Sequence, residues 1–303
     1  MDTVLSVSGL CKRYGRFSAL DHLSLHVPKG AIYGLVGKNG AGKTTLLRII
    51  CGLQHPTGGG YTLFGVAHDS PELSSTLRRI GAVIEAPAMY PDMSAEENLR
   101  QQYRVLGLPS FEGIEELLSL TGLSEAGRKK AKHFSLGMKQ RLGIAMALAG
   151  DPDFLVLDEP VNGLDPQGII EMRELMLQLN REKQITILLS SHLLDELSRI
   201  ATHYGFIDSG RLLREMTAEE FEKSCRKRMR AKVSSVHALS RVLDGMQIPY
   251  EIVSDSEADL FSAVSLSQLA MALSNENAEL ISLQECGESL ESFFLTLVGG
   301  EQR

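Results

Sequence analysis

Tryptophan is absent from the 303-residue chain, and no apolar run is long enough to cross a bilayer. A membrane-spanning helix needs roughly 20 mostly apolar residues, whereas the apolar stretches at residues 142–149 and 185–189 are short and continue into polar residues. The N-terminal residues have no basic segment followed by an apolar core, so they do not resemble a secretory signal. We therefore expect any work at a membrane to be done through a partner.

Cysteine is scarce, and its four positions are far apart: Cys11, Cys51, Cys225 and Cys286. No pair has the close spacing of a zinc motif. In a chain without a secretory signal this predicts reduced, buried thiols rather than a disulfide framework or a zinc site.

Positive charge is not in excess, because 31 Lys and Arg stand against 38 Asp and Glu, for a net charge of −7. Nucleic-acid binding depends largely on neutralising phosphates with Lys and Arg. The composition therefore excludes a general nucleic-acid binder. Two basic runs, residues 128–132 and 226–230, are interpreted as solvated helix faces, with anionic lipid headgroups as the alternative partner.

The hydrophobic pattern divides the chain into two predicted domains, residues 1–217 and 218–303. Alternating apolar and polar residues at 4–10 and 20–27 predict an antiparallel β-subdomain. Strand and helix patterns then alternate around a helical insertion at about residues 87–150, as in a parallel or mixed sheet covered by helices. The predicted fold class is α/β, followed by a small α+β domain.

Residues 218–303 show the order strand, helix, strand, strand, helix, strand, and then a last helix. This order predicts an accessory ferredoxin-like α+β domain. We expect its third strand at residues 260–264 and a helical join at residues 216–221. The domain has no cluster of catalytic residue types, so a regulatory or dimer-stabilising role and a packing extension without a ligand both stay open.

A glycine-rich loop follows the apolar strand predicted at residues 32–36. Its glycines allow backbone N–H groups to converge on a phosphate, and the helix that begins at Lys43 adds its positive end. We expect Lys43 to contact the β and γ phosphates, Thr44 to bind magnesium and Thr45 to touch the α-phosphate. Strand, loop and helix in this order predict a P-loop fold that binds a nucleoside triphosphate. The loop consists of Gly37, Lys38, Asn39, Gly40, Ala41, Gly42, Lys43 and Thr44.

Two further motifs supply candidate residues for ATP hydrolysis and for a second anion site. The apolar run at residues 154–157 ends in Asp158 and Glu159. We expect Asp158 to hold the magnesium shell and Glu159 to orient and deprotonate the attacking water. Ser135 and Gly137 precede a helical pattern at residues 138–149, which predicts a second anion site. Because the chain already has a phosphate loop, this second site is expected to serve the ATP of a neighbouring copy.

Taken together, these motifs resemble the nucleotide-binding subunit of an ABC transporter, over residues from about 4 to 217. In that family residues 37–44 are the Walker A loop, residues 135–140 the signature, Asp158 the Walker B aspartate and Glu159 the catalytic base. The resemblance also implies that Tyr14 stacks on adenine, that residues 162–165 communicate across a dimer and that His192 is the switch histidine. It implies the ABC type of P-loop NTPase fold, with ATP and Mg²⁺ as cofactors.

The chain departs from the common family pattern at three positions. Glu85 stands where the family usually has Gln, and the resemblance places it near the magnesium ion with Thr44. Leu136 and Met138 stand in the signature where Gly and Gln are usual. These departures resemble the branch of bacitracin-resistance and lantibiotic-immunity exporters, whose ATPase works with a separate membrane subunit.

The resulting expectation is an ATP-hydrolysing subunit that powers an exporter of a peptide antibiotic, drug or lipid-like compound. Its partners would be a second copy or a related ATPase, and an integral-membrane permease that docks near residues 85–99. This places the chain in the cytoplasm, on the inner face of the cell membrane. The alternatives are an importer subunit and a soluble ABC ATPase of translation or DNA maintenance, although neither a second ATPase domain nor a long coiled coil is present.

Overall fold

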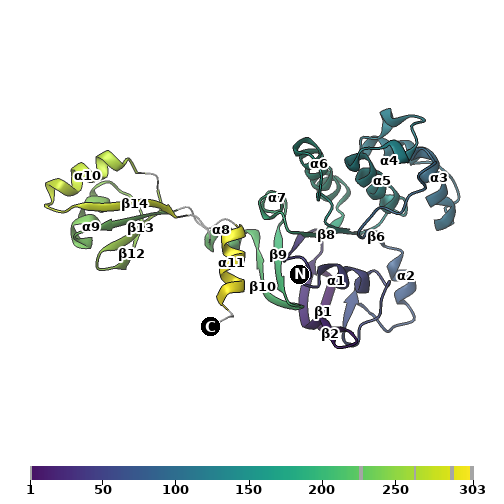
Figure 1. The fold of residues 1–303 in the computed structure, drawn as a ribbon, viewed down its shortest axis with the longest axis horizontal. Helices are drawn as coiled ribbons and strands as arrows, with labels where there is room; N and C mark the ends of the chain where they lie inside the picture. The colour runs from purple at the N-terminus through teal and green to yellow at the C-terminus, as the bar shows by residue number, and fades with distance from the viewer. Residues whose placement is uncertain (1, 225–227, 263, 287–289, 301–303) are drawn as a thin grey trace. The chain divides into compact units, whose positions relative to one another are not determined.

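The computed structural model describes residues 2–224, 228–262, 264–286 and 290–300. These residues form two compact units, one that ends at Ala218 and one that spans Glu219–Gly300 (Figure 1). Among the described residues, no helix is both long and apolar enough to span a bilayer.

The first unit contains two sheets and a group of helices. Its strands are β1 (Thr3–Tyr14), β2 (Phe17–Pro28), β3 (Ile32–Val36), β4 (Gly58–Leu63), β5 (Val66–Ala67), β6 (Ile80–Val83), β7 (Phe154–Asp158), β8 (Thr186–Ser191), β9 (His203–Asp208) and β10 (Arg211–Thr217). Its helices are α1 (Lys43–Ile50), α2 (Leu73–Leu77), α3 (Ala95–Leu106), α4 (Ile114–Leu120), η1 (Ser124–Ala126), η2 (Ala131–His133), α5 (Leu136–Leu148), α6 (Pro166–Lys183) and α7 (Leu194–Ser198).

The larger sheet has the strand order β10-β9-β3-β8-β7-β6. All its pairings are parallel except that of β9 with β10. Every residue of β3, β7 and β8 is buried, which is the pattern of parallel strands covered on both faces. The carboxyl ends of these three strands meet at one edge of the sheet, where ligands bind in open α/β folds.

The smaller sheet is antiparallel, with the order β2-β1-β4-β5. Buried side chains alternate with exposed ones along β2, so one face of this sheet packs on the core. The predicted antiparallel β-subdomain and parallel core are therefore both present.

The helical insertion has a core of its own, which includes Leu99, Tyr103, Phe134 and Leu142. Figure 1 shows α3, α4 and α5 gathered together at a distance from β1 and β2. Helix α3 begins with a capping box in which the Ser94 side chain accepts from the Glu97 N–H and the Glu97 carboxylate accepts from the Ser94 N–H.

Helix α8 (Ala218–Ser224) begins at the last residue of the first unit and continues into the second. The second unit also contains β11 (Arg228–Val233), α9 (Val236–Gly245), β12 (Tyr250–Ser254), β13 (Glu257–Leu260), α10 (Leu266–Asn275), β14 (Leu280–Cys286) and α11 (Leu290–Gly300). Its antiparallel sheet has the order β12-β13-β11-β14. A separate apolar core forms around Leu239, Leu260 and Leu269. From β11 to β14 the elements follow the β-α-β-β-α-β order.

One predicted strand is misplaced. The sequence indicated a strand at residues 260–264, but β13 ends at Leu260 and begins at Glu257. The reason is the hairpin: Glu257 pairs with Ser254 and Ala258 with Ile252, so the pairing starts directly after a tight turn. The apolar residues after Leu260 lie beyond the strand.

The cysteines only partly meet the expectation of buried thiols. Cys11 and Cys51 are free and partly buried. Burial raises the pKa of the Cys51 thiol to about 12. Cys225 lies outside the described residues, as does the side chain of Cys286.

Candidate functional site

The phosphate loop connects β3 to α1, as the sequence predicted. Gly40 and Gly42 have φ angles of +82° and +106°. A Cβ atom on Gly42 would lie 2.6 Å from the carbonyl oxygen of Ala19. Both this close approach and the positive φ therefore require glycine at position 42. The loop thus brings its backbone close to the β-subdomain while leaving the start of α1 accessible to an anion.

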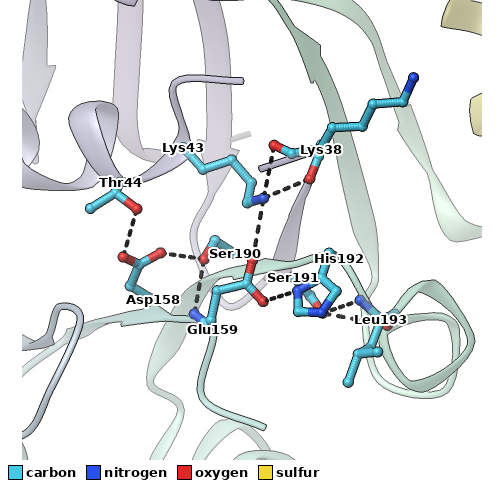
Figure 2. Close-up of polar contacts among 10 residues, drawn as sticks. Lys38, Lys43, Thr44, Asp158, Glu159, Ser190, Ser191, His192 and Leu193 are labelled. Atoms are coloured by element: carbon cyan, nitrogen blue, oxygen red, sulfur yellow. Dashed lines mark hydrogen bonds and ion pairs between the residues drawn. The ribbon is translucent and has the colours of Figure 1, made fainter. Parts of the chain in front are cut away.

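Lys43, the first residue of α1, is buried at the centre of the site. Its Nζ donates to the carbonyl oxygen of Gly37 at 2.6 Å and lies 3.2 Å from Oε1 of Glu159 (Figure 2). The Lys38 carbonyl is a second, longer acceptor at 3.4 Å. The ammonium group is therefore held by oxygen atoms in a position that a phosphate oxygen can share.

Three side chains join α1 to β7 and β8. The Thr44 hydroxyl donates to Oδ2 of Asp158 at 2.8 Å, and the Ser190 hydroxyl donates to Oδ1 of the same carboxylate at 2.6 Å. The Ser190 oxygen in turn accepts from the Glu159 N–H at 2.9 Å. Asp158 and Ser190 are paired directly across β7 and β8 and are both buried. Figure 2 shows this chain of contacts.

Glu159 comes directly after β7 and has a positive φ of 50°, which is rare for a residue with a side chain. Its Oε2 lies 2.6 Å from Nδ1 of His192, while its other oxygen faces Lys43 (Figure 2). The Glu159 side chain is 20% exposed, so it is accessible to water. Backbone strain of this kind often marks a functional residue.

A cleft of about 380 Å³ opens over the loop. Its lining comprises Tyr14, Phe17, Ala19, Lys38, Asn39, Gly40, Gly42, Lys43, Thr44, Thr45 and Glu159. Tyr14 and Phe17 are exposed aromatic rings at one side of this cleft. Ala41 belongs instead to the apolar core. The cleft thus brings Tyr14 and Glu159 together with the predicted loop residues other than Gly37 and Ala41.

Tyr14 is held in place by residues that the sequence did not single out. Its hydroxyl bonds to the side-chain oxygen of Gln54, and the Lys12 ammonium lies 5.3 Å from the centre of its ring. Lys12 Nζ also donates to the carbonyl oxygen of His55 at 2.6 Å. The exposed ring is therefore fixed in orientation beside the phosphate loop.

Ser135 and Gly137 lie at a different cleft, of about 280 Å³, which also includes Gly163 and Leu164. Among the described residues, none lines both this cleft and the one over the phosphate loop. The Ser135 hydroxyl accepts from the Met138 N–H at 3.2 Å and so caps α5. Within one chain, the Ser135 site is therefore separate from the phosphate loop.

Glu85 follows β6 and also has a positive φ, of 64°. Its carboxylate forms an ion pair with Arg48 of α1, and 59% of its side chain is exposed. Glu85, which is expected near the magnesium ion, is thus paired with Arg48 instead. Of the three residues expected to bind magnesium, Thr44 and Asp158 are in contact with each other, whereas Glu85 is paired with Arg48.

Ser190 is a buried polar residue of the site to which the motifs assigned no role. It is fully buried and links the two acidic residues of the site. The signal available in the sequence was a hydroxyl residue at the end of an apolar strand, directly before the segment that contains His192.

Known proteins share both the sequence and this fold. Residues 20–162 match the family described as ABC transporter. The bacitracin transport ATP-binding protein BcrA of Bacillus licheniformis is 39% identical over 303 residues, which covers 99% of each chain. The lantibiotic transport ATP-binding protein SrtF of Streptococcus pyogenes is 41% identical over 212 residues, 70% of this chain and 90% of that protein.

A solved ATP-binding cassette, dimeric and in a post-hydrolysis state with ADP and Pi, is 26% identical with a TM-score of 0.63. The similarity covers 71% of this chain and 98% of that cassette. The sequence relatives and the solved cassette therefore point to the same family. The chain belongs to the ABC transporter family, as an ATP-binding and ATP-hydrolysing subunit.

Proposed function

We propose that the chain powers an exporter of a peptide antibiotic and works as a head-to-tail dimer with two ATP molecules between the copies. The central support is the set of contacts that joins Lys43, Asp158, Glu159, Ser190 and His192 at one edge of the parallel sheet. ATP fits the cleft over the phosphate loop, with the adenine on Tyr14 and the phosphates on the loop N–H groups and Lys43.

Magnesium fits the residues present. Thr44 and Asp158 bring two oxygen donors together at 2.8 Å, and oxygen is the donor that Mg²⁺ prefers. When bound, Mg²⁺ neutralises charge on the phosphate oxygens. Glu85 is proposed as a further oxygen donor, which requires its carboxylate to leave Arg48.

Glu159 is proposed as the general base. In the structure, Oε1 of its carboxylate contacts Lys43 and Oε2 contacts His192. A bound phosphate competes for Lys43, which leaves Oε1 of Glu159 available to accept a proton from the attacking water. His192 holds the other oxygen and so acts as a positioning residue.

The second copy completes the site. Ser135 and Gly137 lie outside the cleft over the phosphate loop, so we assign them to the γ-phosphate held by the partner copy. Neighbouring Gly163 and Leu164 contribute to the same surface, which lets the loop at residues 162–165 respond to the partner. The partner is a second copy or a related ATPase subunit.

A permease is proposed to dock in a groove of about 540 Å³ between β6, α3 and α5. Ala86, Pro87 and Ala88, directly after Glu85, form part of its lining. A groove beside Glu85 would let permease movement reach the nucleotide site. The chain would then lie on the inner face of the cell membrane through this partner.

The export of a peptide antibiotic rests on the relatives. BcrA and SrtF are named for the transport of bacitracin and of a lantibiotic, and BcrA matches over 99% of this chain, including the second unit. For residues 218–303 we propose an accessory role that stabilises the dimer or regulates hydrolysis; a packing role without a ligand is the competing proposal.

The test is to tag the chain in its native cells, solubilise the membranes and identify what co-purifies. We expect a polytopic membrane protein, whose presence in vesicles makes ATP hydrolysis respond to a cyclic or lantibiotic peptide. Recovery with ribosomes or DNA in place of a membrane protein would overturn the proposal.

A further inference from the structure

The antiparallel pair β1 and β2 contains a bulge that gathers three potential metal ligands. Their register shifts between Leu10 and Lys12, so the single residue Cys11 lies opposite two residues, Asp21 and His22. A bulge of this kind bends the strand and redirects its side chains. Here it turns neighbouring residues of β2 toward one cysteine of β1.

The donor atoms of the three side chains all lie within 4.8 Å of one another. Nδ1 of His22 is 2.8 Å from Oδ1 of Asp21, and the His22 N–H donates to Sγ of Cys11 at 3.3 Å. The thiolate is the form of cysteine that binds metals. His22 has a φ of +52°, a costly backbone angle for a residue with a side chain.

We propose that Cys11, Asp21 and His22 bind a divalent transition metal ion of the Zn²⁺ class. A thiolate, an imidazole and a carboxylate together suit Zn²⁺, and they are poor partners for Mg²⁺ or Ca²⁺. Three protein ligands leave the fourth tetrahedral position to water, and 79% of the His22 side chain is exposed on that surface. Binding displaces the proton of the Cys11 thiol, so one proton is released per ion.

Arg211 orients the carboxylate ligand from outside. Its Nε donates to Oδ2 of Asp21 at 2.8 Å, which leaves Oδ1 directed at His22. Hydrogen-bonded outer partners of this kind are typical of metal sites.

Cysteine spacing could not reveal this site, because it has one cysteine and takes its other ligands from the opposite strand. The site is also distinct from the ATPase centre. Its ligands are absent from the lining of the cleft over the phosphate loop. The proposal of a metal site therefore does not depend on the proposed export function.

The test is to titrate the reduced full chain with Co²⁺ and record absorption. We expect one equivalent of Co²⁺ per chain, with a thiolate-to-cobalt charge-transfer band and the visible bands of tetrahedral cobalt, all removed by excess Zn²⁺. Cys11→Ser should abolish the charge-transfer band. His22→Ala should weaken the affinity at least about tenfold, and Arg211→Gln by about 10- to 100-fold.

The matched control is the chain with Cys51, Cys225 and Cys286 all changed to Ser, which keeps only Cys11. Its band should equal that of the unmodified chain. Absence of stoichiometric binding, or a band that survives Cys11→Ser, would overturn the proposal. If the triple variant does not fold, thermal unfolding is the alternative measurement. Zn²⁺ should raise the melting temperature of the unmodified chain but not that of Cys11→Ser. Equal shifts in melting temperature would contradict the site.

Discussion

Ser190 shows how a single buried hydroxyl can organise the ATPase centre. It donates to Asp158, accepts from the Glu159 N–H and is fully buried. Because both partners are functional residues, its loss affects two positions at once.

We predict that Ser190→Ala lowers the ATP turnover rate by about tenfold, the change that a loss of about 1.4 kcal/mol of transition-state stabilisation produces. It should also lower the free energy of unfolding by about 1–3 kcal/mol, since buried polar groups lose a partner. Steady-state ATPase assays and denaturant unfolding measure the two effects. Ser191→Ala, at the adjacent serine whose hydroxyl accepts from Leu193, is the control and should retain most activity. Equal turnover in both variants would contradict this assignment.

The sequence placed Ser190 at the end of an apolar strand, but its partners could not be predicted because they depend on which strands are neighbours. Asp158 and Ser190 are opposite each other only because β7 and β8 pair in parallel with this register. The ion pair of Arg48 with Glu85 and the bond from Tyr14 to Gln54 likewise join residues distant in sequence. By contrast, Asp158 and Glu159 were predictable, since acidic residues that end an apolar strand are a local signal.

At the scale of elements, the strand β3, the glycine loop and helix α1 appeared where the sequence predicted them. These three elements were predictable because each has a local sequence pattern: an apolar run for the strand, glycines for the loop and helical spacing for α1. The misplaced β13 shows the limit of such patterns. Its position is set by the hairpin with β12, whereas the apolar run that suggested a strand continues past Leu260.

The junction of the loop with α1 gives a prediction at this scale. Gly42→Ala should weaken ATP binding at least about tenfold, because a Cβ would lie 2.6 Å from the Ala19 carbonyl oxygen and the φ of +106° is strained for alanine. Titration with a fluorescent ATP analogue measures the affinity. Gly65→Ala is a matched control: its φ is also positive, at +82°, but no atom lies within 4 Å of the added Cβ. We expect unchanged ATP binding for Gly65→Ala, and similar losses of affinity in both variants would contradict this prediction.

At the scale of the whole molecule, the second unit has its own sheet and core. Its removal should therefore leave the core of the first unit intact and show what the second unit contributes. We predict that a chain ending at Ala218 folds and binds ATP with an affinity within about threefold of the full chain, since the cleft over the phosphate loop lies in the first unit. Its ATP-dependent dimer should be at least about tenfold weaker, or its turnover rate altered. Analytical ultracentrifugation and ATPase assays compare the two chains. Identical dimerisation and turnover would favour a packing role without a ligand.

The composite site makes the most direct whole-molecule prediction. Glu159→Gln keeps the size of the side chain but removes the base, so hydrolysis should fall by about 10²- to 10⁴-fold. Bound ATP then persists between Lys43 of one copy and Ser135 of the other. The decisive measurement is the mass of the Glu159→Gln chain in solution with ATP and Mg²⁺, compared with ADP and with Glu159→Gln carrying Ser135→Arg, which blocks the partner site. We expect a dimer with ATP alone and a monomer in both comparisons. A monomer with ATP, or a dimer that Ser135→Arg leaves intact, would contradict the composite site.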